Sequence, residues 1–220
     1  MTSVSPRFIL VAALAVGLSF NLASAVAGLP GPAMLAWKGA GVALLAAYAA
    51  ARARNLDGWL LAGVMACGAL GDVLIDALGA VAGGGAFLIA HVVAVILYAR
   101  NPRPPLGRAE RAVCIALPLA AMAIAVLCVP PQAFNGGVAL YVLGVSAMAG
   151  FAFASRFRRD RVALGAVMFL ASDLLIVTHL PPAQEPRAVS IAIWLLYFLG
   201  QALITLGVSA GFEGDVTPAR

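Results

Sequence analysis

The feature that most constrains this chain is a series of eight long apolar runs separated by short connections. The runs cover about 8–27, 33–51, 59–79, 84–99, 112–129, 136–155, 162–179 and 188–210. A helix needs roughly 20 apolar residues to cross the hydrocarbon core of a bilayer, and its backbone polar groups must be bonded within the segment. The pattern predicts an all-α, polytopic membrane protein with eight transmembrane helices, forming a single domain over residues 1–220.

The composition excludes most other classes of protein. Hydrophobic residues make up 63% of the 220 residues and charged residues only 10%, whereas soluble domains average roughly 45–50% and 25%. A soluble domain of this length cannot hide so much apolar surface, and nucleic-acid binding is excluded with it. The cysteines Cys67, Cys114 and Cys128 lie inside apolar runs without CxxC spacing, so we expect buried free thiols.

The basic residues predict the orientation in the membrane. Of 14 Lys and Arg residues, 12 lie before the first run, after the eighth, or in the connections after the second, fourth and sixth. Arg187 stands alone on the other side, and Lys38 lies within the second run. Because loops rich in Lys and Arg stay in the cytoplasm, we expect both termini on the cytoplasmic side of a cell (inner) membrane.

The first run also resembles a signal peptide, with Arg7, an apolar stretch and then Ala23-Ser24-Ala25. Cleavage there would leave seven spans with the same orientation of the loops. The apolar stretch is long for a signal peptide and contains Asn21. We therefore favour a retained first helix.

Several ionisable and polar residues fall inside the predicted spans, where a charged group is costly and usually functional. At 1.5 Å per residue, Asp72 lies about 20 Å and Asp173 about 17 Å from the cytoplasmic ends of their spans. Lys38 and His91 come out at roughly 21–22 Å and Tyr197 at about 16 Å on the same scale. This agreement in depth predicts one internal site.

A short internal repeat points to the same two aspartates. Residues 71–75 read Gly-Asp-Val-Leu-Ile, and residues 172–176 read Ser-Asp-Leu-Leu-Ile, 101 residues later. Because the third and seventh runs cross in the same direction, a possible 4+4 parallel repeat would bring Asp72 and Asp173 face to face. Two carboxylates in a pocket of low dielectric cannot both ionise easily, so such a pair can act as general acid and general base.

Simpler structural roles are open for several polar residues. Asp76 is interpreted as a solvated residue at the rim, and Lys38 as snorkelling or pairing with an aspartate. Gln201 can bridge helices, while Tyr98 and Tyr141 lie near span ends, where aromatic belts are expected. A zinc site is not predicted, because a zinc enzyme usually has three His or carboxylate ligands and His91 is the one histidine at this depth.

The order of these motifs resembles the YhhN family of lysoplasmalogenases, which share eight spans. The resemblance covers roughly spans two to eight. It rests on Lys38 (followed here by Gly39 instead of the family's usual proline), Gly71-Asp72, Phe87 to His91 with Tyr98, Ser172-Asp173, and Tyr197 with Gln201-Ala202-Leu203-Ile204.

The resemblance implies hydrolysis of the vinyl ether bond of lysoplasmalogens, giving a fatty aldehyde and a glycerophospho-alcohol. The catalytic residues would be Asp72 and Asp173, and the substrate-binding residues Lys38, His91, Tyr197 and Gln201. A lysophospholipid would be the substrate, membrane lipids the surroundings, and no metal, nucleotide or other cofactor would be required. The oligomeric state is left open.

Three other functions compete with this interpretation. A hydrolase of another lipid class comes nearest. A proton-coupled small-molecule transporter would also use paired intramembrane carboxylates, and it would move its substrate without chemical change. A non-enzymatic membrane scaffold would not need polar groups at matched depths.

Overall fold

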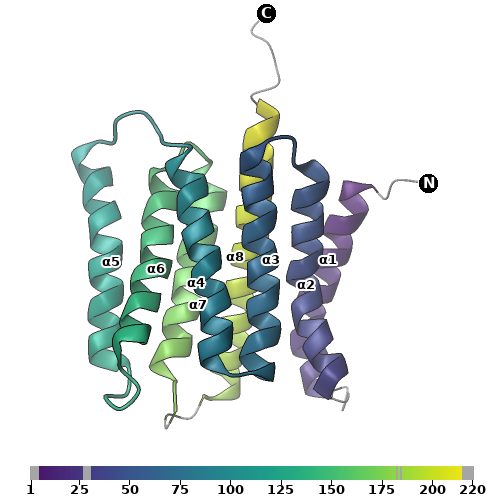
Figure 1. Ribbon diagram of the computed structural model, residues 1–220, viewed down its shortest axis with the longest axis vertical. Coiled ribbons are helices and arrows are strands. Elements are labelled where there is room, and N and C mark those ends of the chain that lie inside the picture. The colour runs from purple at the N-terminus through teal and green to yellow at the C-terminus, as the bar shows by residue number, and fades with distance from the viewer. Residues whose placement is uncertain (1–4, 27–30, 182, 184, 215–220) are drawn as a thin grey trace, which may run out of the picture. The chain divides into compact units, whose positions relative to one another are not determined.

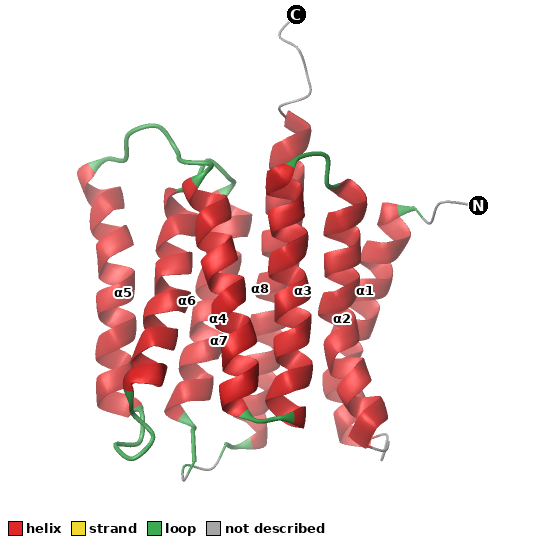
Figure 2. Cartoon of the chain, in the orientation of Figure 1, coloured by secondary structure: helices red, strands yellow, loops and turns green. Residues whose placement is uncertain are grey.

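The computed structural model describes residues 5–26, 31–181, 183 and 185–214. Within these residues all regular structure is helical and no strand is present (Figure 2). The elements are α1 (Pro6–Val26), α2 (Gly31–Arg52), α3 (Leu56–Ala77), α4 (Ala80–Ala99), α5 (Arg108–Cys128), α6 (Gly136–Ala154), the π-helical turn η1 (Arg159–Ala163), α7 (Leu164–Thr178) and α8 (Arg187–Gly214). The predicted all-α fold is confirmed.

The predicted spans agree with the helices to within a few residues. In the described part of the chain, seven helices are long and apolar enough to cross a membrane, and α1 adds a shorter apolar helix over Pro6–Leu22. The chain is therefore a multi-pass membrane protein. Three boundaries differ from the prediction by four residues: α4 begins at Ala80, α5 begins at Arg108, and α8 ends at Gly214. The basic residues just before the fifth run are therefore partly helical.

The helices form two compact units. Unit 1 comprises Met1–Ala94 with Thr205–Arg220, and unit 2 comprises Val95–Ile204. Helices α4 and α8 therefore contribute residues to both units. Asp72, Lys38 and His91 belong to unit 1, whereas Asp173, Tyr197 and Gln201 belong to unit 2.

In unit 1, α1, α2 and α3 lie side by side (Figure 1). The Trp37 indole N–H on α2 donates to the carbonyl oxygen of Val16 on α1, at 3.1 Å. Helix α2 runs through Gly39 without a break, and a Cβ there would lie 2.7 Å from a methyl carbon of Val73. Gly39 thus allows close packing of α2 on α3.

A tight turn joins α3 to α4. Gly79 adopts a φ of +91° there, a conformation that side chains with a Cβ rarely tolerate. One turn further, in the first turn of α4, Gly83 packs against Ile75 so closely that a Cβ would lie 2.5 Å from the Ile75 Cβ. The glycines at the start of the fourth run therefore belong to the helix, and Gly83 serves its packing on α3.

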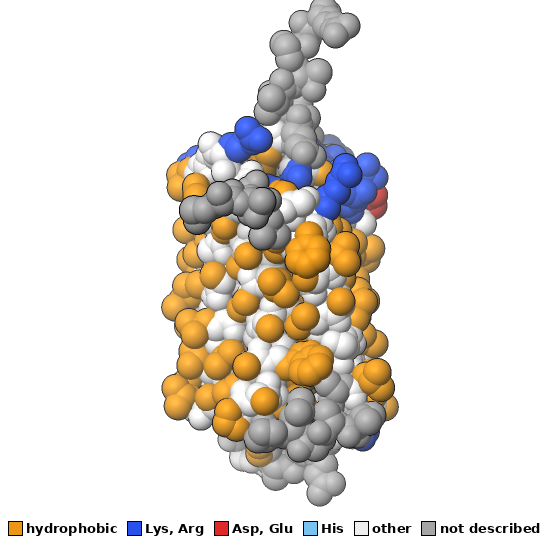
Figure 3. Space-filling model, turned by 90° about the vertical axis from the view of Figure 1, so that its right-hand side faces the viewer, with side chains coloured by type: hydrophobic (Ala, Val, Ile, Leu, Met, Phe, Trp, Pro, Cys, Tyr) orange, Lys and Arg blue, Asp and Glu red, His pale blue; other side chains and the backbone are white. Residues whose placement is uncertain are grey.

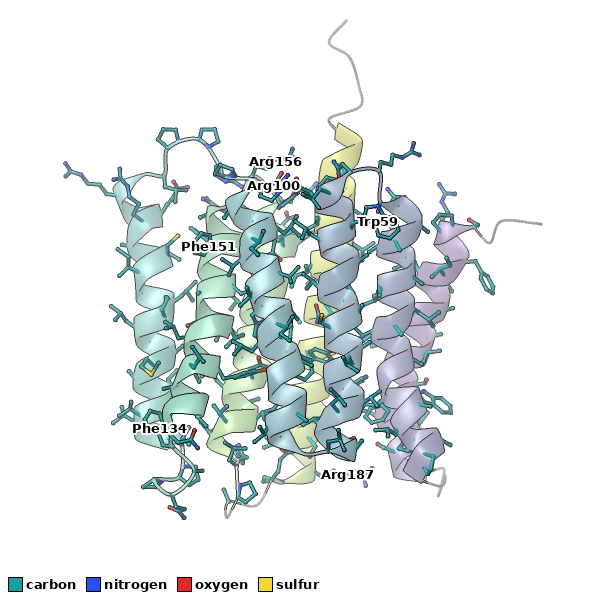
Figure 4. The ribbon with its side chains drawn as sticks, in the orientation of Figure 1. Trp59, Arg100, Phe134, Phe151, Arg156 and Arg187 are labelled. Atoms are coloured by element: carbon teal, nitrogen blue, oxygen red, sulfur yellow. The ribbon has the colours of Figure 1, made fainter. Side chains whose placement is uncertain are left out.

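In unit 2, two loops are bonded together at the end that carries most of the arginines. The Arg103 guanidinium donates to the carbonyl oxygens of Ser155 and Phe157, at 3.2 and 3.0 Å. The Arg156 guanidinium donates to the side-chain oxygen of Asn101, at 2.8 Å. These arginines thus stabilise the loops as well as marking the topology. In Figure 4, Arg100 and Arg156 lie at this end, and Phe134 and Arg187 lie at the opposite end of the unit.

The assignment of Tyr98 to an aromatic belt is wrong. Its side chain is buried in unit 2, with its ring edge-on to Phe157 at a centroid distance of 6.3 Å. An aromatic belt would place the ring at the membrane surface. Here the ring instead packs against Phe157, in the connection between α6 and η1.

The surface of the helices is apolar over most of its length. Figure 3 shows hydrophobic side chains along the face that includes α1, with Lys and Arg gathered at one end. Helix α5 has few buried residues and presents apolar side chains such as Ile115, Leu119 and Leu127 to the bilayer. The three cysteines are free, as predicted, but they are not fully buried: Cys67 and Cys114 are half-buried and Cys128 is exposed.

Candidate active site

Asp72 and Asp173 are the two buried carboxylates of the described residues. Each of the two residues is only 3% exposed. Asp72 lies five residues before the last residue of α3, Ala77, and Asp173 lies five residues before the last residue of α7, Thr178. The distance from the helix end is therefore the same in both. Their predicted approach across one pocket stays a prediction.

The environment of Asp72 is set by close helix packing in unit 1. A Cβ at the preceding residue, Gly71, would lie 2.8 Å from the ring of Phe87 on α4. Glycine at 71 therefore lets the Phe87 ring pack directly against the backbone of α3. Two turns before Asp72, the sulfur of Met65 accepts a hydrogen bond from the Thr205 hydroxyl on α8, at 3.1 Å.

His91 follows Phe87 by one turn on the same face of α4. The contacts of Gly83 with Ile75 and of Phe87 with Gly71 fix the antiparallel register of α3 and α4. Extending this register places His91 about one helical turn from Asp72, toward the start of α3. His91 is 1% exposed. Side chains in a helix tilt toward the N-terminus of that helix. Because α3 and α4 are antiparallel, the side chains of Asp72 and His91 therefore tilt toward each other along the helix axes.

Lys38 makes an ion pair with Asp76, with the ammonium nitrogen 2.7 Å from a carboxylate oxygen. Asp76 stands one turn beyond Asp72, near the end of α3, and its side chain is 51% exposed. The interpretation of Asp76 as an exposed rim residue agrees with this placement. Lys38 thus reaches the aspartate at the rim.

Asp173 has a specific partner in unit 2. The hydroxyl of Tyr141 on α6 donates to the Asp173 carboxylate at 2.8 Å. Tyr141 was assigned to an aromatic belt, and this interpretation overlooked its bond to the site. The signal was available in the sequence, because Tyr141 lies five residues after the start of α6 and Asp173 five residues before the end of α7.

Tyr197 and Gln201 occupy successive turns of α8. The Tyr197 ring packs edge-on against Phe169 of α7, with centroids 5.1 Å apart. It also contacts the Trp194 ring in a tilted arrangement, with centroids 5.7 Å apart. Gln201 is fully buried. One turn before Tyr197, the carbonyl oxygen of Ile193 accepts a hydrogen bond from the hydroxyl of Ser172, the residue next to Asp173, at 2.9 Å. In unit 2 the structure thus brings Asp173, Tyr141 and the Tyr197 face of α8 together.

The arrangement offers proton-transfer groups in an apolar setting. Each buried carboxylate has a neighbour that can hydrogen-bond: His91 near Asp72 by register, and Tyr141 on Asp173 by direct contact. A carboxylate in such surroundings is suited to general acid or base catalysis. No group of three or more His, Cys, Asp or Glu side chains that could hold a metal occurs among the described residues.

Comparison with known proteins identifies the family. Residues 33–208 match the YhhN family. Two relatives, from Mycobacterium bovis (strain ATCC BAA-935 / AF2122/97) and Mycobacterium tuberculosis (strain CDC 1551 / Oshkosh), are each named lysoplasmalogenase. Each is 32% identical over 198 residues, covering 84% of this chain and 74% of the relative. No solved structure matches the chain. The family match covers most of the chain and includes every predicted site residue, and the chain therefore belongs to the YhhN family.

Proposed function

We propose that this protein is a lysoplasmalogenase, an intramembrane hydrolase of the vinyl ether bond of lysoplasmalogens. The observation that carries the proposal is its similarity, over 84% of its length, to relatives that bear this name. The two buried aspartates supply the acid–base groups that the reaction needs. A site inside the membrane also suits a substrate whose alkenyl chain already lies in the bilayer.

The reaction begins with a proton. A protonated aspartic acid delivers it to the outer alkene carbon, which leaves an oxocarbenium ion at the carbon bonded to oxygen. The second, ionised aspartate stabilises this cation and orients the attacking water. The water adds to the cationic carbon and gives up one proton to a carboxylate. The resulting hemiacetal then breaks its bond to the glycerol oxygen, yielding the fatty aldehyde and the glycerophospho-alcohol.

The proposed catalytic groups are Asp72 and Asp173, and Lys38, His91, Tyr197 and Gln201 bind the substrate. The buried position of His91 and Gln201 places their polar groups away from lipid. Tyr197 and its aromatic neighbours offer an apolar wall for an alkenyl chain. The hydrogen bond from Tyr141 supports its assignment as the residue that positions Asp173.

The direct test is mass spectrometry of the purified protein incubated with a lysoplasmalogen and, separately, with the matching ester lysophospholipid. We expect fatty aldehyde from the first substrate and no fatty acid from the second. Release of fatty acid from the ester would favour a hydrolase of another lipid class. Transport of an intact solute into vesicles, without either product, would favour a transporter.

Tyr141→Phe is expected to lower kcat about tenfold, because a hydrogen bond to a charged group is worth about 1.5–3 kcal/mol. The ring is kept, so packing on α6 and the KM for lysoplasmalogen should change little. Steady-state kinetics measures the two constants separately. Tyr48→Phe is the matched control, since it removes a hydroxyl from a buried ring that packs under Arg52 of α2. Equal kcat in the two variants would contradict the positioning role.

We propose that the arginine-rich end of unit 2 faces the cytoplasm, with both chain termini on that side. The positions of Arg100 and Arg156 at one end of the unit, and Arg187 at the other, support this orientation. A fluorescent protein fused after Arg220 should fluoresce, and alkaline phosphatase at the same point should be inactive. Phosphatase inserted after Pro131, between α5 and α6, should be active. The opposite pattern would refute the orientation.

A further inference from the structure

The Lys38–Asp76 ion pair lies at the end of unit 1 where α2 begins and α3 ends. Lys38 is seven residues from the start of α2, and Asp76 is one residue from the end of α3. Their charged atoms are 2.7 Å apart, and the side chains are 18% and 51% exposed. The pair presents a positive and a negative charge side by side at the rim. Acid–base chemistry at Asp72 does not need either group.

The pair stands in a defined order with respect to Asp72. Asp76 follows Asp72 by four residues, so the two side chains share a face of α3, about 6 Å apart along the axis. Moving from the helix end into the membrane, a ligand would meet the ion pair first, then the buried carboxylate, and then apolar helix. A lysophospholipid is built in the same order: charged headgroup, ether oxygen, hydrocarbon chain.

The spacing also fits the substrate. The phosphate of a lysophospholipid is joined to the ether oxygen through the three-carbon glycerol backbone, a span comparable with one helical turn of about 5.4 Å. With the ether bond at Asp72, the phosphate would lie level with Asp76 and within reach of the flexible Lys38 side chain. The outermost part of the headgroup would then lie at the exposed carboxylate of Asp76.

We propose that Lys38 and Asp76 form a subsite for a zwitterionic headgroup, with phosphate on the Lys38 ammonium and the headgroup ammonium on the Asp76 carboxylate. The inference rests on the proposed function and specifies which lysophospholipids the site accepts. A ligand that carries both charges replaces one ion pair by two and leaves neither protein group unpaired. A ligand with phosphate but no ammonium separates Asp76 from Lys38 and leaves the Asp76 carboxylate without a positively charged partner.

Opening the pair is compatible with its exposure. Ion pairs in contact with solvent contribute little to stability, because water screens them and side-chain freedom is lost in forming them. Contacts between charged donors and phosphate or carboxylate oxygens are short and strong. Exchange of the internal pair for two ligand contacts is therefore favourable, and the pair closes again when the product leaves.

Binding of non-hydrolysable lipids tests the subsite. Native mass spectrometry would measure the affinity of the full-length protein for saturated 1-O-alkyl lysophospholipids with an ethanolamine or a glycerol headgroup. We expect the ethanolamine lipid to bind up to about fivefold more tightly, the upper range for an ion pair in contact with solvent. Asp76→Asn should abolish this preference, and Lys38→Met should weaken binding of both lipids about tenfold.

Two further variants separate recognition from folding. Exchange of the two residues, Lys38→Asp with Asp76→Lys, keeps an ion pair at this position and reverses its direction, and we expect it to lose the preference. Asp160→Asn removes the acid of another exposed ion pair, with Arg158, and should bind like the unaltered protein. Equal affinity of the unaltered protein for both headgroups, or an unchanged preference after the exchange, would overturn the subsite.

The outcome is independent of turnover. A protein that binds the ethanolamine lipid preferentially but leaves the vinyl ether of lysoplasmalogens intact would refute the proposed function and keep the subsite. Hydrolysis of lysoplasmalogens together with equal affinity for both headgroups would refute the subsite and keep the function.

Discussion

Asp72→Asn and Asp173→Asn are each expected to lower the turnover of lysoplasmalogen by about 10²–10⁴-fold, the usual loss when a general acid or base is removed. Asparagine has nearly the same shape as aspartate but can neither ionise nor donate a carboxylic proton. At position 173 the new amide oxygen can still accept the Tyr141 hydrogen bond. The loss should therefore appear in kcat, measured as aldehyde release under saturating substrate.

The double substitution distinguishes a cooperating pair from two independent groups. When residues act as a unit, the losses of activity caused by their substitution are strongly non-additive. The double variant should therefore lose little more activity than the less active of the two single variants. Two independent groups would instead give the product of the single losses.

The controls for these variants concern folding. Removing a buried charge can be neutral or stabilising, so all three variants should remain in the membrane and elute as the unaltered protein does. Asp160→Asn, at an exposed carboxylate, should keep full turnover. Near wild-type turnover in either single variant, once it is correctly folded, would remove that aspartate from the mechanism.

The helices could be predicted from the sequence because bilayer thickness dictates their length. Apolar runs of the right length specified every span to within a few residues. Two of the boundary differences, at the starts of α4 and α5, lie where the sequence has glycine or arginine, which predict a break. The three glycines at 83–85 continue α4, and Gly83 packs on Ile75 of the neighbouring helix. Arg108 begins α5, where the Gly107 amide N–H donates to the Glu110 carboxylate at 2.7 Å.

The site was only partly predictable, because depth along a helix says nothing about rotation around it. Depth selected both buried aspartates, Asp72 and Asp173. It also grouped Lys38 with Asp72, although the long lysine side chain reaches the aspartate one turn away. Tyr141 is expected in an aromatic belt because it lies near a span end, although its distance from the helix end matches that of Asp173. Tertiary packing decides which side chains contact each other, and the sequence of a single helix does not reveal this packing.

The contacts of the arginines were also only partly predictable from the sequence. Their distribution predicted the loops in which they lie, but charge counting treated all of them as equivalent. Arg103 and Arg156 bond the loops to each other. Arg159 pairs with Glu110 at 2.7 Å and lies over the Phe153 ring. Except for the contact with Phe153, these contacts join residues about 50 positions apart in sequence, and only the packed unit brings them together.

Gly165→Ala is expected to lower the stability of unit 2 by about 1–3 kcal/mol, the usual cost of overpacking. Helices α7 and α8 approach each other closely at Gly165 and Gly200. A Cβ at Gly165 would lie 2.6 Å from the Gly200 carbonyl oxygen, and a Cβ at Gly200 would lie 2.7 Å from the Gly165 carbonyl oxygen. The obstructing atoms are backbone, so no side-chain rotation relieves the clash and the helices must separate.

This separation should reach the candidate site. Phe169 and Tyr197 pack across the same pair of helices one turn away, at 5.1 Å, and Gln201 directly follows Gly200. We therefore expect Gly165→Ala and Gly200→Ala to lower the midpoint temperature of unfolding, which circular dichroism in detergent measures. Both substitutions should also reduce turnover. A lowered midpoint with full turnover would show that the helix contact and the site are independent.

Gly63→Ala provides the matched comparison. Gly63 lies inside α3, and a Cβ there would meet nothing within 4 Å. Alanine in an open helical position is favoured over glycine by about 0.5–1 kcal/mol, so this substitution should raise the midpoint. The same chemical change is thus expected to have opposite effects at the two positions. A midpoint of Gly165→Ala at or above that of the unaltered protein would mean that α7 and α8 do not need their close approach.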